Sequence, residues 1–122
     1  MGANRFSREL RLLTAADYKQ VFDQSQRKAS HRHLLLLATA NELDHYRLGL
    51  VIAKKNVKLA VQRNRIKRLA REFFRHQARL TGPEGQPHFD VVLLTRRGID
   101  VLDNEEVSTI LRQQWQKLTA TT

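Results

Sequence analysis

The residues with the clearest chemical capacity form a run of arginines and lysines near the middle of the chain. Positions 63 to 75 hold six basic residues and one acid, Glu72. At helical spacing several of these cations repeat at i and i+4, where each like-charge pair costs a few tenths of a kcal/mol. The planar fork of arginine suits bidentate binding of phosphate and stacking on bases. The run therefore predicts a helix whose outer face is neutralised by a phosphate backbone.

This helix is expected from about Leu59 to Arg79, before the Gly82–Pro87 loop. At about 100° per residue, one arc collects an apolar stripe that can pack on a sheet: Leu59, Ile66, Leu69, Ala70, Phe73, Gln77 and Leu80. The opposite side carries Asn64, Lys67, Arg68, Arg71 and Arg75, with Arg63 and Arg65 on its flanks. The plain alternative is a solvated basic face without a partner, and the density of cations argues against it.

No other side chains have the spacing of a catalytic or metal site. The five histidines lack the spaced pairs typical of zinc sites, and the chain has no cysteine. Asp103, Glu105 and Glu106 are the densest acids, and helix capping explains them. A protein-only nuclease would need carboxylates that converge on two metal ions. We therefore expect neither a catalytic residue nor a metal ligand in this chain.

Several other elements must position the basic helix. The first of them is a helix whose start is predicted by a capping box from Thr14 to Asp17. Tyr18, Val21 and Phe22 follow at i, i+3 and i+4, which places two rings on one face. Residues 24–32 are polar and are expected to be a loop. The pattern then predicts a strand from His33 to Thr39.

A second strand is expected from Tyr46 to Ala53, joined to the first as an antiparallel hairpin. One of its faces is small, with Gly49 at its centre, so a neighbour can approach the backbone closely. A third strand is expected from Phe89 to Thr95, and a last helix from the N-cap Asp103. The apolar face of that helix comprises Val107, Ile110, Leu111, Trp115 and Leu118. The element order α-β-β-α-β-α predicts an α+β fold, a small mixed sheet packed by helices in an α-β sandwich.

Composition sets the broad class. The 122 residues suit a single domain spanning 1–122, with a basic arm over 1–13 and a frayed tail over 119–122. A net charge of +10 attracts a polyanion, which is a nucleic acid, an acidic membrane or an acidic protein. The sequence shows no membrane-spanning stretch and no signal peptide, so we expect a cytoplasmic protein without a membrane partner.

The motifs resemble those of a known family. Lys54-Lys55-Asn56-Val57 after a strand, followed by Arg63-Asn64-Arg65-Ile66-Lys67-Arg68 and Arg71-Glu72, is similar to the signature of the bacterial ribonuclease P protein. Further similarity lies in Arg8–Thr14, Tyr18–Phe22, Arg47–Leu50, Phe89–Val92 and Arg96–Gly98. The resemblance covers most of residues 5–118.

The resemblance implies a subunit of a ribonucleoprotein that removes the 5′ leader from precursor tRNA by hydrolysis. Its partners would be the catalytic RNA and precursor tRNA, without an obligate protein partner, and Mg²⁺ would be held mainly by the RNA and the substrate. The residues implied to face the catalytic RNA are Lys54, Lys55, Asn56, Arg63, Asn64, Arg65, Lys67, Arg68 and Arg71. The family fold, like the second domain of ribosomal protein S5, carries a left-handed βαβ crossover, against the usual hand.

The resemblance also implies a cleft between the first helix and the sheet, where leader nucleotides stack. Tyr18, Phe22, Leu36 and Arg96 would line it. Many family members have an aromatic or polar residue in the first strand facing the cleft. This chain has leucines around Leu36, so apolar packing is expected there.

Three other classes of protein share some of these features. A structural ribosomal-type protein has a similar size and charge, and would not support precursor-tRNA cleavage. A DNA-binding regulator would use the basic helix, but the chain shows no helix-turn-helix partner or dimer zipper. A basic amphipathic membrane binder would need the apolar face that the core requires.

Overall fold

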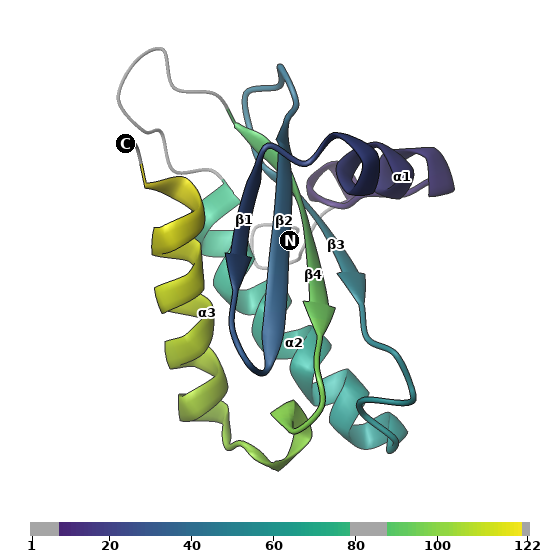
Figure 1. Ribbon diagram of the computed structural model, residues 1–122, viewed down its shortest axis with the longest axis vertical. Coiled ribbons are helices and arrows are strands. Elements are labelled where there is room, and N and C mark those ends of the chain that lie inside the picture. The colour runs from purple at the N-terminus through teal and green to yellow at the C-terminus, as the bar shows by residue number, and fades with distance from the viewer. Residues whose placement is uncertain (1–7, 79–87, 121–122) are drawn as a thin grey trace.

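The computed structural model describes residues 8–78 and 88–120. Four strands form one sheet, and three α-helices with two short 3-10 helices surround it (Figure 1). The helices are η1 (Arg8–Leu10), α1 (Ala15–Gln24), α2 (Ala60–Ala78), η2 (Ile99–Val101) and α3 (Asn104–Thr119). The strands are β1 (Arg27–Ser30), β2 (Leu34–Ala40), β3 (Arg47–Val51) and β4 (Phe89–Thr95). The α+β fold class is confirmed.

The sheet order is β1-β2-β4-β3, and it corrects two predictions. The segment predicted as a loop over 24–32 contains β1, which pairs antiparallel with β2. The hairpin predicted between β2 and β3 does not form, because β4 lies between them, antiparallel to β2 and parallel to β3. The sequence pattern of β2 and β3 does not reveal that β4 separates them, because β4 begins only at Phe89, far along the chain from both strands.

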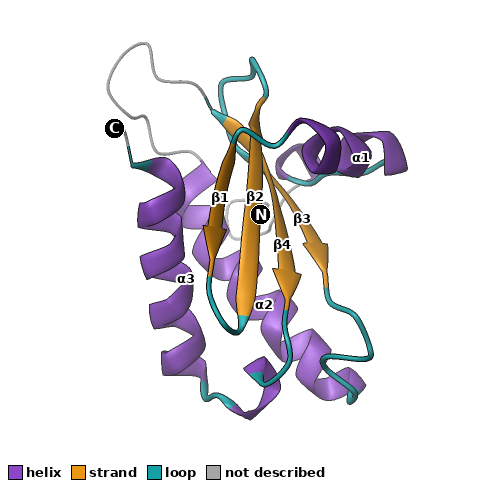
Figure 2. Ribbon diagram, in the orientation of Figure 1, coloured by secondary structure: helices purple, strands orange, loops and turns teal. Residues whose placement is uncertain are grey.

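The helices cover the two faces of the sheet unequally (Figure 2). The larger core lies between one face and the pair α2 and α3, and the smaller core, with Leu12, Val21 and Val92, lies under α1 on the other face. Because α2 lies behind the sheet in Figure 1, with β4 to the left of β3 and both arrows pointing down, the β3–α2–β4 crossover is left-handed. This hand agrees with the expectation from the family.

Both predicted capping boxes are present. The Thr14 hydroxyl accepts from the Asp17 amide, and the Asp17 carboxylate accepts from the Thr14 amide. Asp103 and Glu106 form the same pair at the start of α3. Such caps satisfy amides that the first turn leaves without partners. The starts of α1 and α3 are therefore determined locally, by residues that sequence alone identifies.

Part of the arm predicted over 1–13 is ordered. Arg11 bridges to Leu48 in parallel, and the Leu12 amide donates to the Leu48 carbonyl at 3.0 Å, so this segment covers the outer edge of β3. Thr119 ends α3, and the Ala120 carbonyl accepts from Arg27. Residues 1–7, 121–122 and the predicted Gly82–Pro87 loop lie outside the described residues. Within 8–78 and 88–120, no helix combines the length and hydrophobicity of a membrane span.

Candidate RNA-binding interface

The outward face of α2 carries cations that no side chain within residues 8–78 and 88–120 neutralises. Lys67, Arg68 and Arg71 form no hydrogen bond or ion pair with any residue in the described part of the chain, and Asn64 is exposed beside them. The opposite face of the helix is buried through Ile66, Ala70 and Phe74. A helix held by its apolar face therefore presents this row of cations to solvent, as predicted.

The apolar stripe itself differs from the prediction at its ends. Leu59 is 62% exposed and lies before the first residue of α2, whereas Phe74 is buried at 3%. Phe74 packs edge to face against Trp115 of α3, with ring centroids 5.4 Å apart. Because α2 packs against α3 as well as the sheet, its buried arc turns toward Phe74. Arg75, predicted on the outer face, is instead paired with Glu72.

The guanidinium groups of Arg63 and Arg65, on the flanks of this face, donate hydrogen bonds within the protein. Arg63 donates to the carbonyls of Val57 and Lys58 at 3.0 and 2.8 Å, which braces the loop before α2.

Arg65 reaches the segment between η2 and α3. Its donors contact Gln62, Asn104 and the carbonyls of Asp100 and Leu102, at 2.7 to 3.3 Å. All three nitrogens of Arg65 therefore have partners within the fold, and its contact with RNA stays a prediction.

The loop from β3 to α2 adds cations at the end of the sheet. Lys54, Lys55 and Lys58 are exposed, and Asn56 donates from Nδ2 to the Thr95 carbonyl at 2.9 Å. Asn56 therefore ties the loop to the end of β4 and is a structural contact rather than a free ligand. The lysines extend the cationic surface from α2 toward the open face of the sheet.

The sheet face under α1 is organised in three rows that run across the strands. The row nearest the first turn of α1 is polar and holds Thr39, Asp90 and Arg47. The next row is Leu37, Val92 and Gly49, and the row beyond it is Leu35, Leu94 and Val51. Leu35, Leu37, Leu94 and Val51 are only half-buried. They form an aliphatic floor that α1 covers on one side only.

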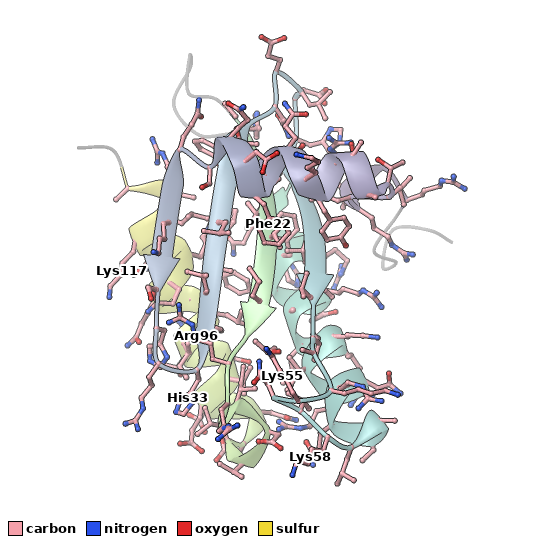
Figure 3. The ribbon with its side chains drawn as sticks, turned by 45° about the vertical axis from the view of Figure 1, so that its right-hand side comes forward. Phe22, His33, Lys55, Lys58, Arg96 and Lys117 are labelled. Carbon is pink, nitrogen blue, oxygen red and sulfur yellow. The ribbon has the colours of Figure 1, made fainter. Side chains whose placement is uncertain are left out.

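The two predicted rings of α1 have different surroundings. Phe22 is 43% exposed and lies beneath α1 at one end of this floor (Figure 3). Tyr18 is half-buried against Gly49, and its hydroxyl accepts from the Leu50 amide at 3.3 Å. Phe22 therefore has a ring surface available for stacking, whereas Tyr18 mainly attaches α1 to β3. This contact is also the close approach to Gly49 that the sequence predicted.

Leu36, which the sequence placed in the cleft, faces the other way. It is 3% exposed and packs in the larger core with α2 and α3. Successive side chains of a strand point to opposite faces, so the leucine that faces α1 is Leu37. The expectation of apolar packing in the cleft holds for Leu37, and the prediction for Leu36 is wrong by one position.

Arg96 lies at the far end of the floor, beyond Leu94. Its Nη1 donates to the Ser30 hydroxyl at 2.9 Å and to the His31 carbonyl at 2.8 Å. Figure 3 shows Arg96 and Lys55 toward the end of the sheet opposite Phe22. The floor therefore runs from an exposed ring to a cationic end.

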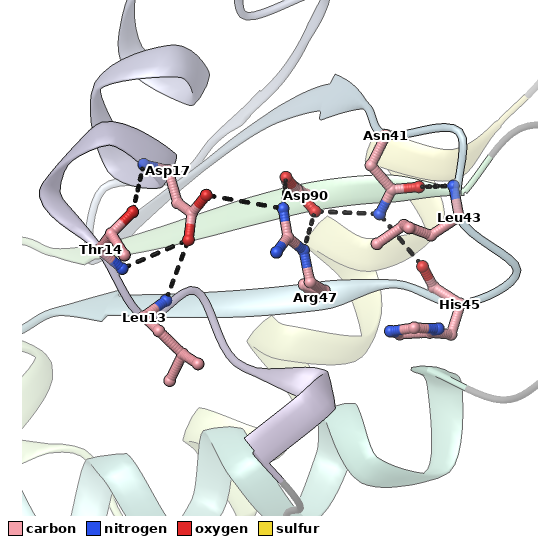
Figure 4. Close-up of polar contacts among 8 residues, drawn as sticks. All are labelled: Leu13, Thr14, Asp17, Asn41, Leu43, His45, Arg47 and Asp90. Atoms are coloured by element: carbon pink, nitrogen blue, oxygen red, sulfur yellow. Dashed lines mark hydrogen bonds and ion pairs between the residues drawn. The ribbon is translucent and has the colours of Figure 1, made fainter.

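The first turn of α1 is joined to the sheet by charged side chains that the sequence did not single out as a site. Arg47 donates from Nε and Nη2 to the two carboxylate oxygens of Asp90, at 2.8 and 2.6 Å (Figure 4). Arg47 also lies 3.9 Å from Asp17. The signal that was available in the sequence is a single charged residue near the start of each of these otherwise mainly apolar strands, Arg47 in β3 and Asp90 in β4.

The electrostatics of these groups follow from their contacts. Partial desolvation acts to raise the pKa of Asp17, but bonds from the Leu13 and Thr14 backbone, the Thr14 side chain and the charge of Arg47 outweigh it and lower the pKa. Hydrogen bonding to Asp90 raises the pKa of Arg47 above its ordinary value. Both groups are held in their charged forms. Among residues 8–78 and 88–120, no three histidine or acidic side chains lie together as possible metal ligands.

Comparison with known protein families shows which family this chain belongs to. The model of the family described as Ribonuclease P matches residues 6–119. The chain belongs to the ribonuclease P protein family. Similar family proteins are the "Ribonuclease P protein component" of Pseudomonas aeruginosa strain PAO1, 50% identical over 119 residues, and that of Marinobacter nauticus, 46% identical over 118 residues. These alignments cover 97% of this chain and 84% and 85% of the relatives.

Solved structures of the family share the fold. An RNase P protein from Staphylococcus aureus superposes with a TM-score of 0.76 at 24% identity, covering 91% of this chain and 98% of that one. An RNase P protein from Thermotoga maritima, in complex with 1-(4-fluorophenyl)-2-thiourea, gives 0.70 at 26% identity, covering 91% and 99%. The chain is thus the protein component of the ribonuclease P holoenzyme, an RNA-binding protein of tRNA processing with an RNA partner in that enzyme.

Proposed function

We propose that this protein binds the catalytic RNA of ribonuclease P through the outer face of α2 and the leader of precursor tRNA over the open sheet face. The observation that carries the proposal is the row Lys67, Arg68 and Arg71, which lacks partners in the described residues although its helix is firmly packed. Phosphates of a folded RNA are suitable counterions for such a row. Lys54 and Lys55 extend the same contact.

The leader is proposed to lie along the aliphatic floor, with a base stacked on Phe22. A base stacked on an aromatic side chain contributes about 1–3 kcal/mol and depends little on sequence. Leu37 and Leu94 offer an apolar surface for the sugar and base, and the cations at the Arg96 end offer charge for the phosphates. Together these contacts favour a single strand attached to the tRNA over mature tRNA without one.

The chemistry itself is proposed to reside in the RNA. Mg²⁺ would be held mainly by the RNA and the substrate, where it supplies the activated water for hydrolysis. The residues of this chain bind and orient the RNA strands. A cytoplasmic location, where tRNA precursors are made, belongs to the same proposal.

The test is reconstitution of the chain with a ribonuclease P RNA and a radiolabelled tRNA precursor at low magnesium. Arg68→Ala is expected to weaken binding of the catalytic RNA and to flatten the slope of log K against log salt by roughly 0.7–0.9, the value for one phosphate contact. Arg112→Ala, on the exposed side of α3, is the matched control and should leave the slope unchanged. Equal slopes for the two variants would contradict phosphate binding by α2.

Leader binding has its own test. Phe22→Ala should reduce the preference for precursor over mature tRNA by roughly 5- to 150-fold, which corresponds to one lost stack of about 1–3 kcal/mol. Assembly with the catalytic RNA should be unchanged. Equal losses for precursor and mature tRNA would show a general defect and would contradict stacking on Phe22.

A further inference from the structure

A polar cluster closes the floor beneath the first turn of α1. Arg47 and Asp90 are register partners on the parallel strands β3 and β4, and both of their side chains face α1. Asn41 donates from Nδ2 to Asp90 at 2.9 Å and to the His45 carbonyl at 3.1 Å. Figure 4 shows the resulting chain of contacts from Asp17 through Arg47 and Asp90 to Asn41.

We infer that Arg47 and Asp90 are positioning residues for leader binding, because they hold α1 through Asp17 and so determine where Phe22 lies over the sheet. This inference rests on the proposed function of the cleft. It assigns a role in substrate discrimination to residues that need not contact the leader.

The geometry supports positioning rather than direct binding. Two nitrogens of Arg47 already donate to Asp90, whose side chain is 7% exposed, so the pair is rigid and largely shielded. The Asp17 carboxylate also accepts from the amides of Leu13 and Thr14. It therefore fixes the helix start through hydrogen bonds and adds an ion pair with the Arg47 guanidinium at 3.9 Å.

The polar attachments of α1 lie in its first turn, whereas Phe22 lies near the other end of the helix, beside the buried Val21. Asp17 contacts Arg47, and the neighbouring Tyr18 rests on Gly49. At 1.5 Å per residue, Phe22 is about 7.5 Å from Asp17 along the helix axis. A tilt of about 10° at the first turn would therefore shift Phe22 by roughly 1 Å, a displacement large enough to weaken a stacked contact.

The experiment compares two substitutions that make the same change of charge on the same helix. Asp17→Asn removes the ion pair with Arg47 and retains an oxygen that can accept from the amides of Leu13 and Thr14. Asp23→Asn is the matched control, since Asp23 pairs only with the exposed Lys19 among the described residues. Each variant is assembled with a ribonuclease P RNA, and affinities for precursor and mature tRNA are measured.

Positioning and simple electrostatics predict opposite results. Removing a carboxylate near RNA favours binding on charge alone, so a phosphate-binding Arg47 freed from Asp17 would raise precursor affinity. Positioning predicts that Asp17→Asn lowers the precursor-to-mature preference by roughly two- to fivefold, the equivalent of one partly exposed ion pair. The control Asp23→Asn makes the same change of charge without touching Arg47, so it should not lower the preference, and α1 amides should exchange faster only in Asp17→Asn.

Arg47→Lys provides a second variant that keeps the charge and loses the bidentate pair with Asp90. It should lower the precursor preference without changing the salt slope, because no phosphate contact is lost. The inference is overturned if Asp17→Asn and Arg47→Lys both keep the precursor preference of the Asp23→Asn control while Phe22→Ala still lowers it. If Phe22→Ala also has no effect, the proposed leader site itself is wrong.

Discussion

Substitution of Gly49 gives the sharpest test of how α1 is seated. A Cβ atom at this position would lie 2.5 Å from Cε1, 2.7 Å from Cζ and 2.9 Å from the hydroxyl oxygen of Tyr18. The Tyr18 hydroxyl is bonded to the Leu50 amide, so relief of the clash requires the ring or α1 to move and breaks that hydrogen bond. Overpacking of this kind costs about 1–3 kcal/mol. Loss of the hydrogen bond adds about 0.5–1.5 kcal/mol.

A double-mutant cycle isolates this contact. Gly49→Ala alone should destabilise the protein by about 1.5–4.5 kcal/mol, the sum of the two costs. In a Tyr18→Ala background the clash is absent. There, Gly49→Ala should be neutral or stabilising by up to about 1 kcal/mol, since glycine weakens a strand interior.

The assay is urea unfolding followed by the fluorescence of Trp115, the single tryptophan of the chain, which is buried on α3. Free energies of unfolding are compared between variants that have the same m-value, because an equal m-value shows that unfolding exposes the same amount of surface. Additive costs in the cycle would refute the reasoning, because they would show that Gly49 and Tyr18 do not act through one contact.

Three other outcomes are expected. Arg65→Ala should destabilise the fold by about 1–3 kcal/mol in urea unfolding, because its carbonyl partners lose a charged donor, whereas Arg68→Ala should change stability by less than about 0.5 kcal/mol. Leu36→Ala should cost about 2–5 kcal/mol by the same assay, whereas the half-buried Leu37→Ala should cost less and lower the precursor preference. The pKa of Asp17 lies below its ordinary 3.8 in the folded protein, so its contribution to stability is lost as pH falls through the folded value. An acid titration of Asp17→Asn should therefore show a flatter loss of stability below pH 3.8.

Features that depend on neighbours in the sequence could be predicted well. Both capping boxes, the extent of α2 and the outward positions of Lys67, Arg68 and Arg71 depend on residues three or four positions apart, and the structure has them where expected. The approach of a neighbour to Gly49 was also visible, because a small residue in a strand face leaves space. The motifs around the basic helix were sufficient to indicate the family.

Features that depend on long-range pairing could not be predicted. Nothing near β2 or β3 indicates that β4 separates them, because hydrogen bonds between strand backbones do not depend on side-chain type. A uniform run of leucines gave no alternation to show that Leu37, and not Leu36, faces α1. The pairing of Arg47 with Asp90 across forty-three positions likewise required the parallel register.

The sequence by itself indicated a polyanionic partner, since a net charge of +10 and a helix with one cationic face attract a polyanion whatever the topology. The tertiary structure decided which cations are available to that partner. Arg63 and Arg65 donate hydrogen bonds to carbonyls of other segments. Lys67, Arg68 and Arg71 have no such partners among the described residues. The physical reason is that helical spacing determines which side of α2 a residue occupies, but only packing determines what lies within reach of its side chain.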